Sequence, residues 1–309
     1  MNVLITGGAG FKGVVLTEML ARLSAGHEIV VIDNFRWGLS PVLTLFQYPN
    51  VKIVKGDVRD KQLMEGYVLG ADVIINLAGI VGYPECARFE REAREVNVDA
   101  VYQLADMVKP SQKFIQASTG SVYGKLDDTC TETSGTNPLT VYGETNLEAE
   151  TPVLGAGGIC LRFATAFGIS PCMRFDLLPN FFSFRAVHDR YLVVYEAEAR
   201  RTFIDTYDMA RAYLFAIDHY EAMKGGIFNV GDERLNVNKG DVAEWVCELT
   251  GADLFIESVG KDLDARDYEV SYAKINALGY FCQHTVQDRL PLIVKIAELY
   301  DRRDNWRIG

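Results

Sequence analysis

Four glycines near the start of the chain, at positions 7, 8, 10 and 13, lie between an apolar run over 3–5 and a helical pattern over 14–23. Glycine adopts positive φ angles and lets the backbone approach a ligand closely. The first turn of a helix has unpaired N–H groups and the positive end of the helix dipole, which together bind phosphate. A strand, a glycine turn and a helix in this order predict that Gly7, Gly10 and Gly13 surround the pyrophosphate of a dinucleotide.

An acidic residue ends the next apolar run. Asp33 follows the run over 28–32 and lies 20 residues beyond Gly13. A carboxylate at this point accepts hydrogen bonds from the adenosine ribose and repels a 2′-phosphate, so NAD is favoured over NADP. Arg36 is close enough in sequence to leave NADP open as an alternative.

Two hydroxyl side chains farther along the chain could act on a substrate. Thr119 follows a strand-like run over 113–117, and Tyr142 begins a helical pattern over 142–150. In a parallel sheet both would face the nicotinamide end of the cofactor. Tyr142 could act as an acid and base if its pKa falls from about 10, and Thr119 could hydrogen-bond the same substrate hydroxyl.

The elements that position these residues alternate along the first half of the chain. Strand-like runs occur over 3–5, 29–32, 51–54, 73–77, 113–117 and 158–163, with amphipathic helical stretches between them. This alternation predicts an α/β fold built on a Rossmann-type doubly wound parallel sheet. The regularity fades after about residue 170, although helices are expected near 207–220, 239–249 and 291–302. We therefore expect an NAD-binding domain over 1–170 and a smaller substrate-binding lobe mainly over 171–309, with some later segments returning to the first domain.

Composition narrows the class of protein. The chain has 309 residues and a formal net charge of −11, and no Lys/Arg cluster stands out, which argues against nucleic-acid or anionic-membrane partners. The six cysteines form no CxxC pair and the four histidines are scattered, so neither a metal site nor a disulfide framework is indicated. The first strand begins at residue 3 and no run of 18 apolar residues occurs. A cytoplasmic protein with reduced thiols is the simplest expectation.

Several ordered motifs carry a resemblance to a known family. They are TGGAGFKG, GDVRD, NLAG, STGSVYG and PLTVYGETN in the first half, and RTFI, NVG and DARDYEVSYAKI in the second. With these motifs the chain resembles the extended short-chain dehydrogenase/reductases, in the branch of nucleotide-sugar epimerases and dehydratases. The resemblance covers nearly the whole chain. It implies NAD as cofactor, a nucleotide-diphosphate sugar as substrate and a homodimer whose interface includes the helix after Tyr142. Pro152 predicts that this helix is short, which leaves the interface open.

The resemblance also implies roles for matching positions. Contacts to the cofactor are implied for Gly7, Gly10, Phe11, Lys12, Gly13, Asp33, Asn34, Asp57, Val58, Leu77, Ala78, Gly79, Tyr142 and Asn146. Contacts to the substrate are implied for Val81, Glu85, Cys86, Thr119, Ser121, Asn180, Arg201 and Arg266, and catalysis for Tyr142, Thr119 and Asn146. Arg201 and Arg266 suit a diphosphate chemically, because a guanidinium binds phosphate through two parallel hydrogen bonds. Surface ion pairing is the alternative for both arginines.

One departure concerns the catalytic motif. The family has a lysine four residues after the tyrosine, and this chain has Asn146. The lysine bonds the nicotinamide ribose and lowers the tyrosine pKa, whereas an asparagine can do only the first. A unit charge at about 6 Å, with an effective dielectric constant near 20, contributes about 3 kcal/mol or roughly two pKa units. The tyrosine could be slower or more alkaline, Glu85 or Cys86 could act as the base, or the protein could bind a nucleotide sugar without turnover.

Two further departures refine the prediction. Lys12 stands where the family usually has an apolar residue. Its side chain either points to solvent or lies beside the pyrophosphate loop, where it could strengthen cofactor binding or partly replace the lost charge. Gly120 and Ser121 occupy the positions of the Asp-Glu pair of sugar-nucleotide 4,6-dehydratases, which disfavours elimination of water. The leading hypothesis is an NAD-dependent nucleotide-sugar epimerase that oxidises the sugar transiently. A dehydratase or decarboxylase of the same family, or a catalytically weak binder, is the alternative.

Overall fold

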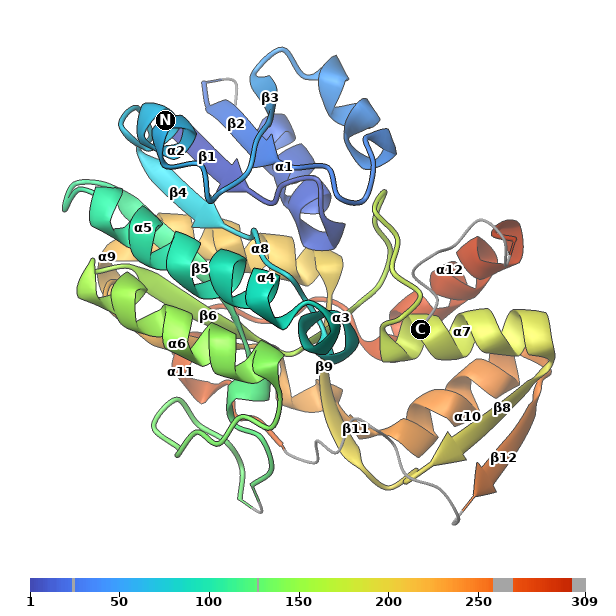
Figure 1. Cartoon of the computed structure of the whole chain (residues 1–309). Coiled ribbons are helices and arrows are strands. Elements are labelled where there is room, and N and C mark those ends of the chain that lie inside the picture. The colour runs from blue at the N-terminus through green and yellow to red at the C-terminus, as the bar shows by residue number, and fades with distance from the viewer. Residues whose placement is uncertain (24–25, 127, 258–268, 302–309) are drawn as a thin grey trace.

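A seven-stranded sheet forms the centre of the computed structural model, which describes residues 1–23, 26–126, 128–257 and 269–301 (Figure 1). Its strand order is β10-β6-β5-β4-β1-β2-β3, and every neighbouring pair is parallel. The strands are β1 (Asn2–Thr6), β2 (Glu28–Asp33), β3 (Val51–Lys55), β4 (Val73–Asn76), β5 (Lys113–Thr119), β6 (Ile159–Phe163) and β10 (Ile227–Val230). The predicted doubly wound α/β fold is confirmed. The strand order reverses between β1 and β4, and ligands bind at such a point in this class of sheet.

Helices cover both faces of this sheet. On one face α1 (Phe11–Leu23) packs against α8 (Thr206–Asp218), and on the other lie α2 (Lys61–Val68), α5 (Ala100–Met107) and α6 (Val141–Gly155) (Figure 1). The residues of β1 alternate between the two cores, because successive strand side chains point to opposite faces. Val3 and Ile5 join the core under α1 and α8, and Leu4 joins the core under α2, α5 and α6.

Pro152 lies inside α6, which continues past it and ends at Gly155. Pro152 falls in the last turn of the helix, where losing one amide donor removes little of the hydrogen-bond ladder.

Four shorter helical segments lie in the connections between strands of the large sheet: η1 (Ser40–Gln47), α3 (Tyr83–Arg88), α4 (Glu90–Arg94) and η2 (Glu95–Asp99).

The second half of the chain builds a smaller lobe and also contributes to the large sheet. The lobe holds the sheet β11-β9-β7, the parallel pair β12-β8 and three helices, which lie together on one side of the large sheet (Figure 1). These elements are β7 (Thr165–Phe167), α7 (Leu178–Asp189), β8 (Tyr191–Tyr195), β9 (Arg200–Asp205), β11 (Asn236–Asn238), α10 (Lys239–Thr250), β12 (Asp253–Glu257) and α12 (Val286–Leu299). Strand β10 and helix α8 belong to the large sheet and its layers. Residues after 170 thus contribute to both parts.

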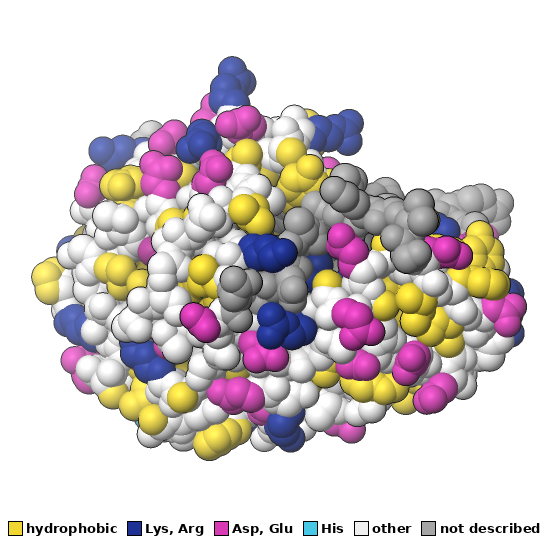
Figure 2. Space-filling model, turned by 90° about the horizontal axis from the view of Figure 1, so that it is seen from below, with side chains coloured by type: hydrophobic (Ala, Val, Ile, Leu, Met, Phe, Trp, Pro, Cys, Tyr) yellow, Lys and Arg dark blue, Asp and Glu magenta, His cyan; other side chains and the backbone are white. Residues whose placement is uncertain are grey.

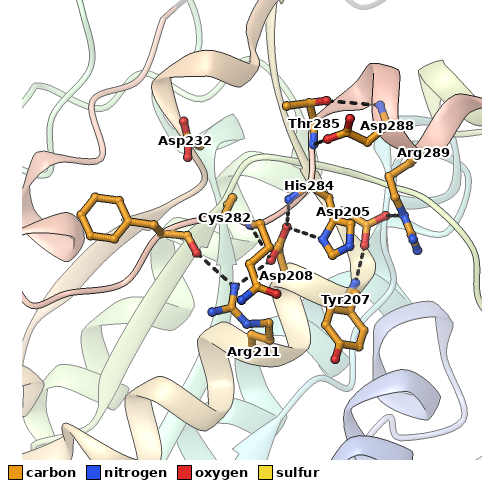
Figure 3. Close-up of polar contacts among 12 residues, drawn as sticks. Asp205, Tyr207, Asp208, Arg211, Asp232, Cys282, His284, Thr285, Asp288 and Arg289 are labelled. Atoms are coloured by element: carbon orange, nitrogen blue, oxygen red, sulfur yellow. Dashed lines mark hydrogen bonds and ion pairs between the residues drawn. The ribbon is translucent and has the colours of Figure 1, made fainter.

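A buried polar cluster ties α8 to the segment that leads into α12 (Figure 3). Asp205 caps α8 by accepting from the Tyr207 backbone N–H at 2.8 Å, and its Oδ2 lies 2.9 Å from Arg289 Nε. Asp208 accepts from the backbone N–H groups of residues 283 and 284 at 3.0 and 2.9 Å. Both carboxylates are fully buried, and burial raises the pKa of Asp205. These contacts hold the small lobe against a helix of the large sheet.

The surface carries mixed charge. On the face shown in Figure 2, the basic side chains of the described residues are dispersed among acidic ones. No helix within the described residues combines the length and the apolar composition that a membrane crossing needs.

Candidate functional site

A pocket opens over the carboxyl ends of the central strands, where the strand order reverses. Its wall contains fifteen of the residues proposed from the sequence: Gly7, Gly10, Phe11, Lys12, Asp33, Asn34, Asp57, Val58, Leu77, Ala78, Gly79, Val81, Thr119, Ser121 and Tyr142. These residues come from the ends of β2 and β5, from the segments that follow β1 to β5, and from the first turns of α1 and α6. The fold thus brings residues from distant parts of the sequence to one pocket.

The glycine loop leaves no room for side chains. Gly7 has φ +67°, and a Cβ added there would lie 2.6 Å from the Ala78 backbone nitrogen. A Cβ on Gly13 would lie 2.6 Å from the Gly7 carbonyl oxygen, so Gly13 lies behind the loop and lets α1 begin close to it. Gly7 and Gly10 line the pocket with backbone alone. A loop of this kind at a helix N-terminus fits the pyrophosphate of a dinucleotide.

Asp33 is held in place at the edge of this pocket. Its Oδ2 accepts from the Ala9 backbone N–H at 2.9 Å and its Oδ1 from the Phe35 N–H at 2.8 Å. Arg36 also lines the pocket, but its guanidinium lies 2.8 Å from Glu92 Oε2 and 3.4 Å from Glu85 Oε2. Two carboxylates therefore compete with any phosphate for Arg36. This pairing fits NAD better than NADP.

Three residues with hydroxyl groups line the same pocket, Thr119, Ser121 and Tyr142. The Thr119 hydroxyl lies 3.2 Å from that of Ser121 and also accepts from the Ser121 N–H. Thr140 caps α6 by accepting from the Gly143 N–H at 3.1 Å, which places Tyr142 in the first turn. A Cβ on Gly143 would lie 2.8 Å from the Ser121 carbonyl oxygen, so this glycine lets α6 pack directly against the Ser121 turn.

Besides Arg36, two more cationic residues line this pocket, Lys12 and Arg174. Lys12 lines it and places its Nζ 5.2 Å from the centre of the Phe163 ring, so the solvent-directed alternative for Lys12 is wrong. Burial, followed by repulsion from Arg174, lowers the pKa of Lys12 to about 8. Arg174 was not proposed from the sequence, because no local motif marks it. It enters the pocket from the segment between β7 and α7 and pairs with Asp176.

Asn146 does not reach the pocket wall. Its side-chain amide donates to the backbone carbonyl oxygen of Tyr142 at 2.8 Å, and Asn146 is absent from the described residues that line the pocket. The asparagine side chain is short enough to hydrogen-bond one turn back along its own helix. The cofactor contact and the catalytic role expected of Asn146 stay predictions.

The two alternative bases also lie outside the pocket wall. Cys86 is fully buried and its Sγ–H donates to the Ile80 carbonyl oxygen at 3.1 Å. Burial, with a smaller contribution from Glu85, raises the pKa of Cys86 to about 12. Glu85 is engaged by Arg36. A thiol that stays protonated and a carboxylate that is paired are poor candidates for a base.

Three residues expected to contact the substrate are absent from the described pocket wall. Asn180 is fully buried in α7, where its Nδ2 donates to the carbonyl oxygens of Gly168 and Arg174 at 2.8 Å each. Arg201 is 3% exposed on β9 and donates to the Arg200 carbonyl oxygen at 2.9 Å. Arg266 lies outside the described residues. Asn180 is therefore bonded to the backbone of the segment that carries Arg174.

Comparisons with known proteins agree with this geometry. The model of the NAD dependent epimerase/dehydratase family matches residues 3–231. The chain is 28% identical to a UDP-N-acetyl-alpha-D-glucosaminuronate decarboxylase of Bacillus cytotoxicus, covering 99% of this chain and 94% of that protein. It is 26% identical to a UDP-glucose 4-epimerase of Corynebacterium glutamicum, covering 81% of each.

The fold is also that of solved structures. A UDP-glucuronic acid 4-epimerase from Bacillus cereus, in complex with UDP-glucuronic acid and NAD, superposes with a TM-score of 0.84 at 23% identity, covering 97% of this chain and 100% of that one. A dTDP-glucose 4,6-dehydratase from Bacillus anthracis, in complex with NAD, gives a TM-score of 0.83 at 23% identity, with 97% of both chains covered. The family expected from the sequence is confirmed: this chain belongs to the NAD-dependent epimerase/dehydratase family, with NAD as its cofactor.

Proposed function

We propose that this protein is an NAD-dependent nucleotide-sugar epimerase that oxidises its sugar transiently to a ketone. One observation carries the proposal. Tyr142, Thr119 and Ser121 line the same pocket as the glycine loop and Asp33. A candidate acid-base group thus shares one pocket with hydrogen-bonding groups that could orient a sugar hydroxyl and with a dinucleotide site.

The chemistry needs two transfers from one sugar carbon. When bound, NAD⁺ supplies a reversible acceptor for the hydride of that carbon. Tyr142 Oη takes the proton of the hydroxyl on the same carbon, which leaves a ketone. Thr119 accepts or donates a hydrogen bond at that oxygen and holds it toward Tyr142. Presentation of the opposite ketone face, followed by return of hydride and of the Tyr142 proton, gives the epimer with all atoms retained.

A nucleotide-diphosphate sugar is the proposed substrate. UDP-sugar and dTDP-sugar names recur among the similar proteins. We also propose a homodimer, as the family resemblance implies, and a cytoplasmic location, as expected from the composition. Contacts of Asn180 and Arg201 to the diphosphate stay part of this proposal, although Asn180 Nδ2 and Arg201 Nη1 each donate to a backbone oxygen in this structure.

Decarboxylation is the second candidate function, and the relative from Bacillus cytotoxicus favours it because that protein is a decarboxylase that matches 99% of this chain. Both functions begin with the same oxidation. A 4,6-dehydratase is less favoured because Gly120 and Ser121 stand at the acid and base positions. A binder without turnover remains the alternative from a different functional class.

The proposal is tested by incubating purified protein with a panel of UDP- and dTDP-sugars, including uronic acids, in deuterium oxide without added cofactor. Proton NMR and mass spectrometry follow each sugar. We expect a product of unchanged mass with one inverted centre. Loss of CO₂ would assign the decarboxylase, loss of water would assign the dehydratase, and no change in any sugar would leave only the binder.

A further inference from the structure

The pocket supplies a positive charge from outside the tyrosine motif. Among the described residues, its wall contains three cationic side chains, Lys12, Arg36 and Arg174. Arg36 is paired with Glu85 and Glu92 at the Asp33 end. Lys12 and Arg174 lie close enough to repel one another. These two are therefore the candidates for a charge that acts on Tyr142.

Arg174 interacts electrostatically with Tyr142. The phenol of Tyr142 contributes to raising the pKa of Arg174, although burial opposes that shift and Asp176 contributes more. A hypothetical Cβ on Gly82 would lie 3.7 Å from Arg174 Nη2, so the guanidinium lies beside the loop after β4. Arg174, Gly82 and Tyr142 all line the same pocket.

The neighbours of Arg174 hold it in this position. Its Nε donates to Asp176 Oδ1 at 3.0 Å and its Nη2 to Oδ2 at 2.5 Å. The buried Asn180 side chain donates to the Arg174 carbonyl oxygen at 2.8 Å. A bidentate carboxylate and a fixed backbone oxygen restrict the guanidinium to few conformations. Asp176 also offsets part of its charge.

The other groups around Tyr142 leave Arg174 as the permanent cation. Lys12 gives up its proton near pH 8, whereas an arginine stays protonated through the range in which a tyrosine titrates. Arg94 of α4 is engaged by Glu144 and Glu148 at 3.4 and 3.5 Å and is not part of the described pocket wall.

The other side chains that the described residues place near Tyr142 are a phenol, a thiol and hydroxyls. From α8, Tyr213 interacts electrostatically with Tyr142, and burial followed by that interaction raises the pKa of Tyr213. From α3, Cys86 is a neutral thiol within the apolar cluster against which Tyr142 packs. From the turn after β5, Thr119 and Ser121 present hydroxyls.

We propose that Arg174 is the positioning residue whose charge activates Tyr142, in place of the lysine that Asn146 replaces. This inference rests on the proposed role of Tyr142. The positive charge that the sequence motif lacks is thus supplied by a residue from another part of the chain. Arg174 lies in the segment before α7, and the negative charge of Asp176 offsets part of its positive charge.

The test is a titration of Tyr142 itself. The ultraviolet absorbance of tyrosinate is followed against pH in the NAD-loaded protein, and the curve of the same protein carrying Tyr142→Phe is subtracted. Arg174→Met should raise the pKa of Tyr142 by about one to two units. Arg174→Lys should restore most of the shift. Asp176→Asn should move the pKa downward, because it removes the carboxylate that offsets the guanidinium.

Arg185→Met is the matched control, since Arg185 of α7 pairs with Asp189 and is absent from the described pocket wall. It should leave the Tyr142 curve unchanged. A curve for Arg174→Met that coincides with this control overturns the inference. If Arg174→Met does not fold, Asp176→Asn decides, and an unchanged or upward pKa overturns the inference. The readout needs no turnover, so failure of the proposed epimerase activity leaves this test intact.

Discussion

The side-chain amide of Asn146 donates a hydrogen bond to the backbone carbonyl oxygen of Tyr142, 2.8 Å away. Asn146, which replaces the motif lysine, is thus bonded to its own helix, and it follows the tyrosine by one turn. It brings neither a charge nor a side chain to the pocket wall. On the proposal above, the charge that acts on Tyr142 therefore comes from other elements, above all from Arg174.

Restoring the motif lysine should add another positive charge near Tyr142. Asn146→Lys places a second cation one turn from Tyr142, which should raise turnover severalfold and lower the pH optimum by about one unit. The measurement is kcat against pH for the wild type and the variant. Asn146→Gln, which adds length without charge, is the control and should keep the wild-type profile. An unchanged profile for Asn146→Lys would contradict the electrostatic account of this position.

Burial of Lys12 should make folding stability depend on pH. The folded protein releases the Lys12 proton near pH 8, and the unfolded chain holds it to about 10.5. Between these values the unfolded state binds more protons, so stability rises with pH. Lys12→Met should therefore be more stable than the wild type below pH 8, by no more than about 3 kcal/mol. This advantage should shrink toward pH 10.5.

Urea denaturation of both proteins at several pH values measures this difference. Other groups titrate in both proteins and cancel. Lys12→Arg is the comparison for packing, because it keeps a permanent charge and should remove the pH dependence without gaining stability. A constant difference between Lys12→Met and the wild type from pH 7 to 10 would show that Lys12 keeps its proton in the folded state.

Cys86 should be dispensable for chemistry. Its thiol is buried, donates to the Ile80 carbonyl oxygen and has a pKa of about 12. Cys86→Ala should keep kcat within roughly twofold and cost about 1 kcal/mol of stability through the lost contacts. Turnover and urea denaturation measure the two effects. A loss of kcat of about a hundredfold in a stably folded variant would restore Cys86 as a base.

Asp33 should set the cofactor preference. Removing the carboxylate removes an acceptor for the ribose and the repulsion of a 2′-phosphate. Asp33→Ser should weaken NAD about tenfold and narrow the preference for NAD over NADP, as a Kd ratio measured by calorimetry. Asp33 also accepts from the Ala9 and Phe35 N–H groups, so the substitution could loosen this loop. Because a looser loop would weaken the binding of both cofactors, the ratio of the two Kd values cancels this effect. An unchanged ratio would mean that Asp33 does not face the ribose.

The fold and the cofactor end of the site could be predicted because their signals are local. Strands β1 and β4 are buried on both faces and read as continuous apolar runs. Gly7, Gly13 and Asp33 follow such strands or open a helix, so short-range sequence already fixes their place. The helix expected from Pro291 begins earlier, at Val286, because Thr285 and Asp288 form a capping box.

The charges at the substrate end could not be predicted in this way. Arg174 reaches the pocket through the packing of α7 and through Asn180, whose partner Gly168 is 12 residues away. The inward orientation of Cys86 and the backward bond of Asn146 also depend on tertiary packing. A family motif gives the position of a residue in the sequence but not the direction of its side chain. Packing against residues that are distant in sequence therefore determines which of these side chains can reach a ligand.

On the proposed mechanism, Tyr142 moves the proton of a nucleotide sugar beside bound NAD. The most direct measurement compares wild type with Tyr142→Phe across the UDP- and dTDP-sugar panel, with NAD content determined in both proteins. We expect the wild type to convert at least one sugar, and Tyr142→Phe to lose about a hundredfold or more of kcat while retaining NAD. Equal turnover in the two proteins would contradict the account.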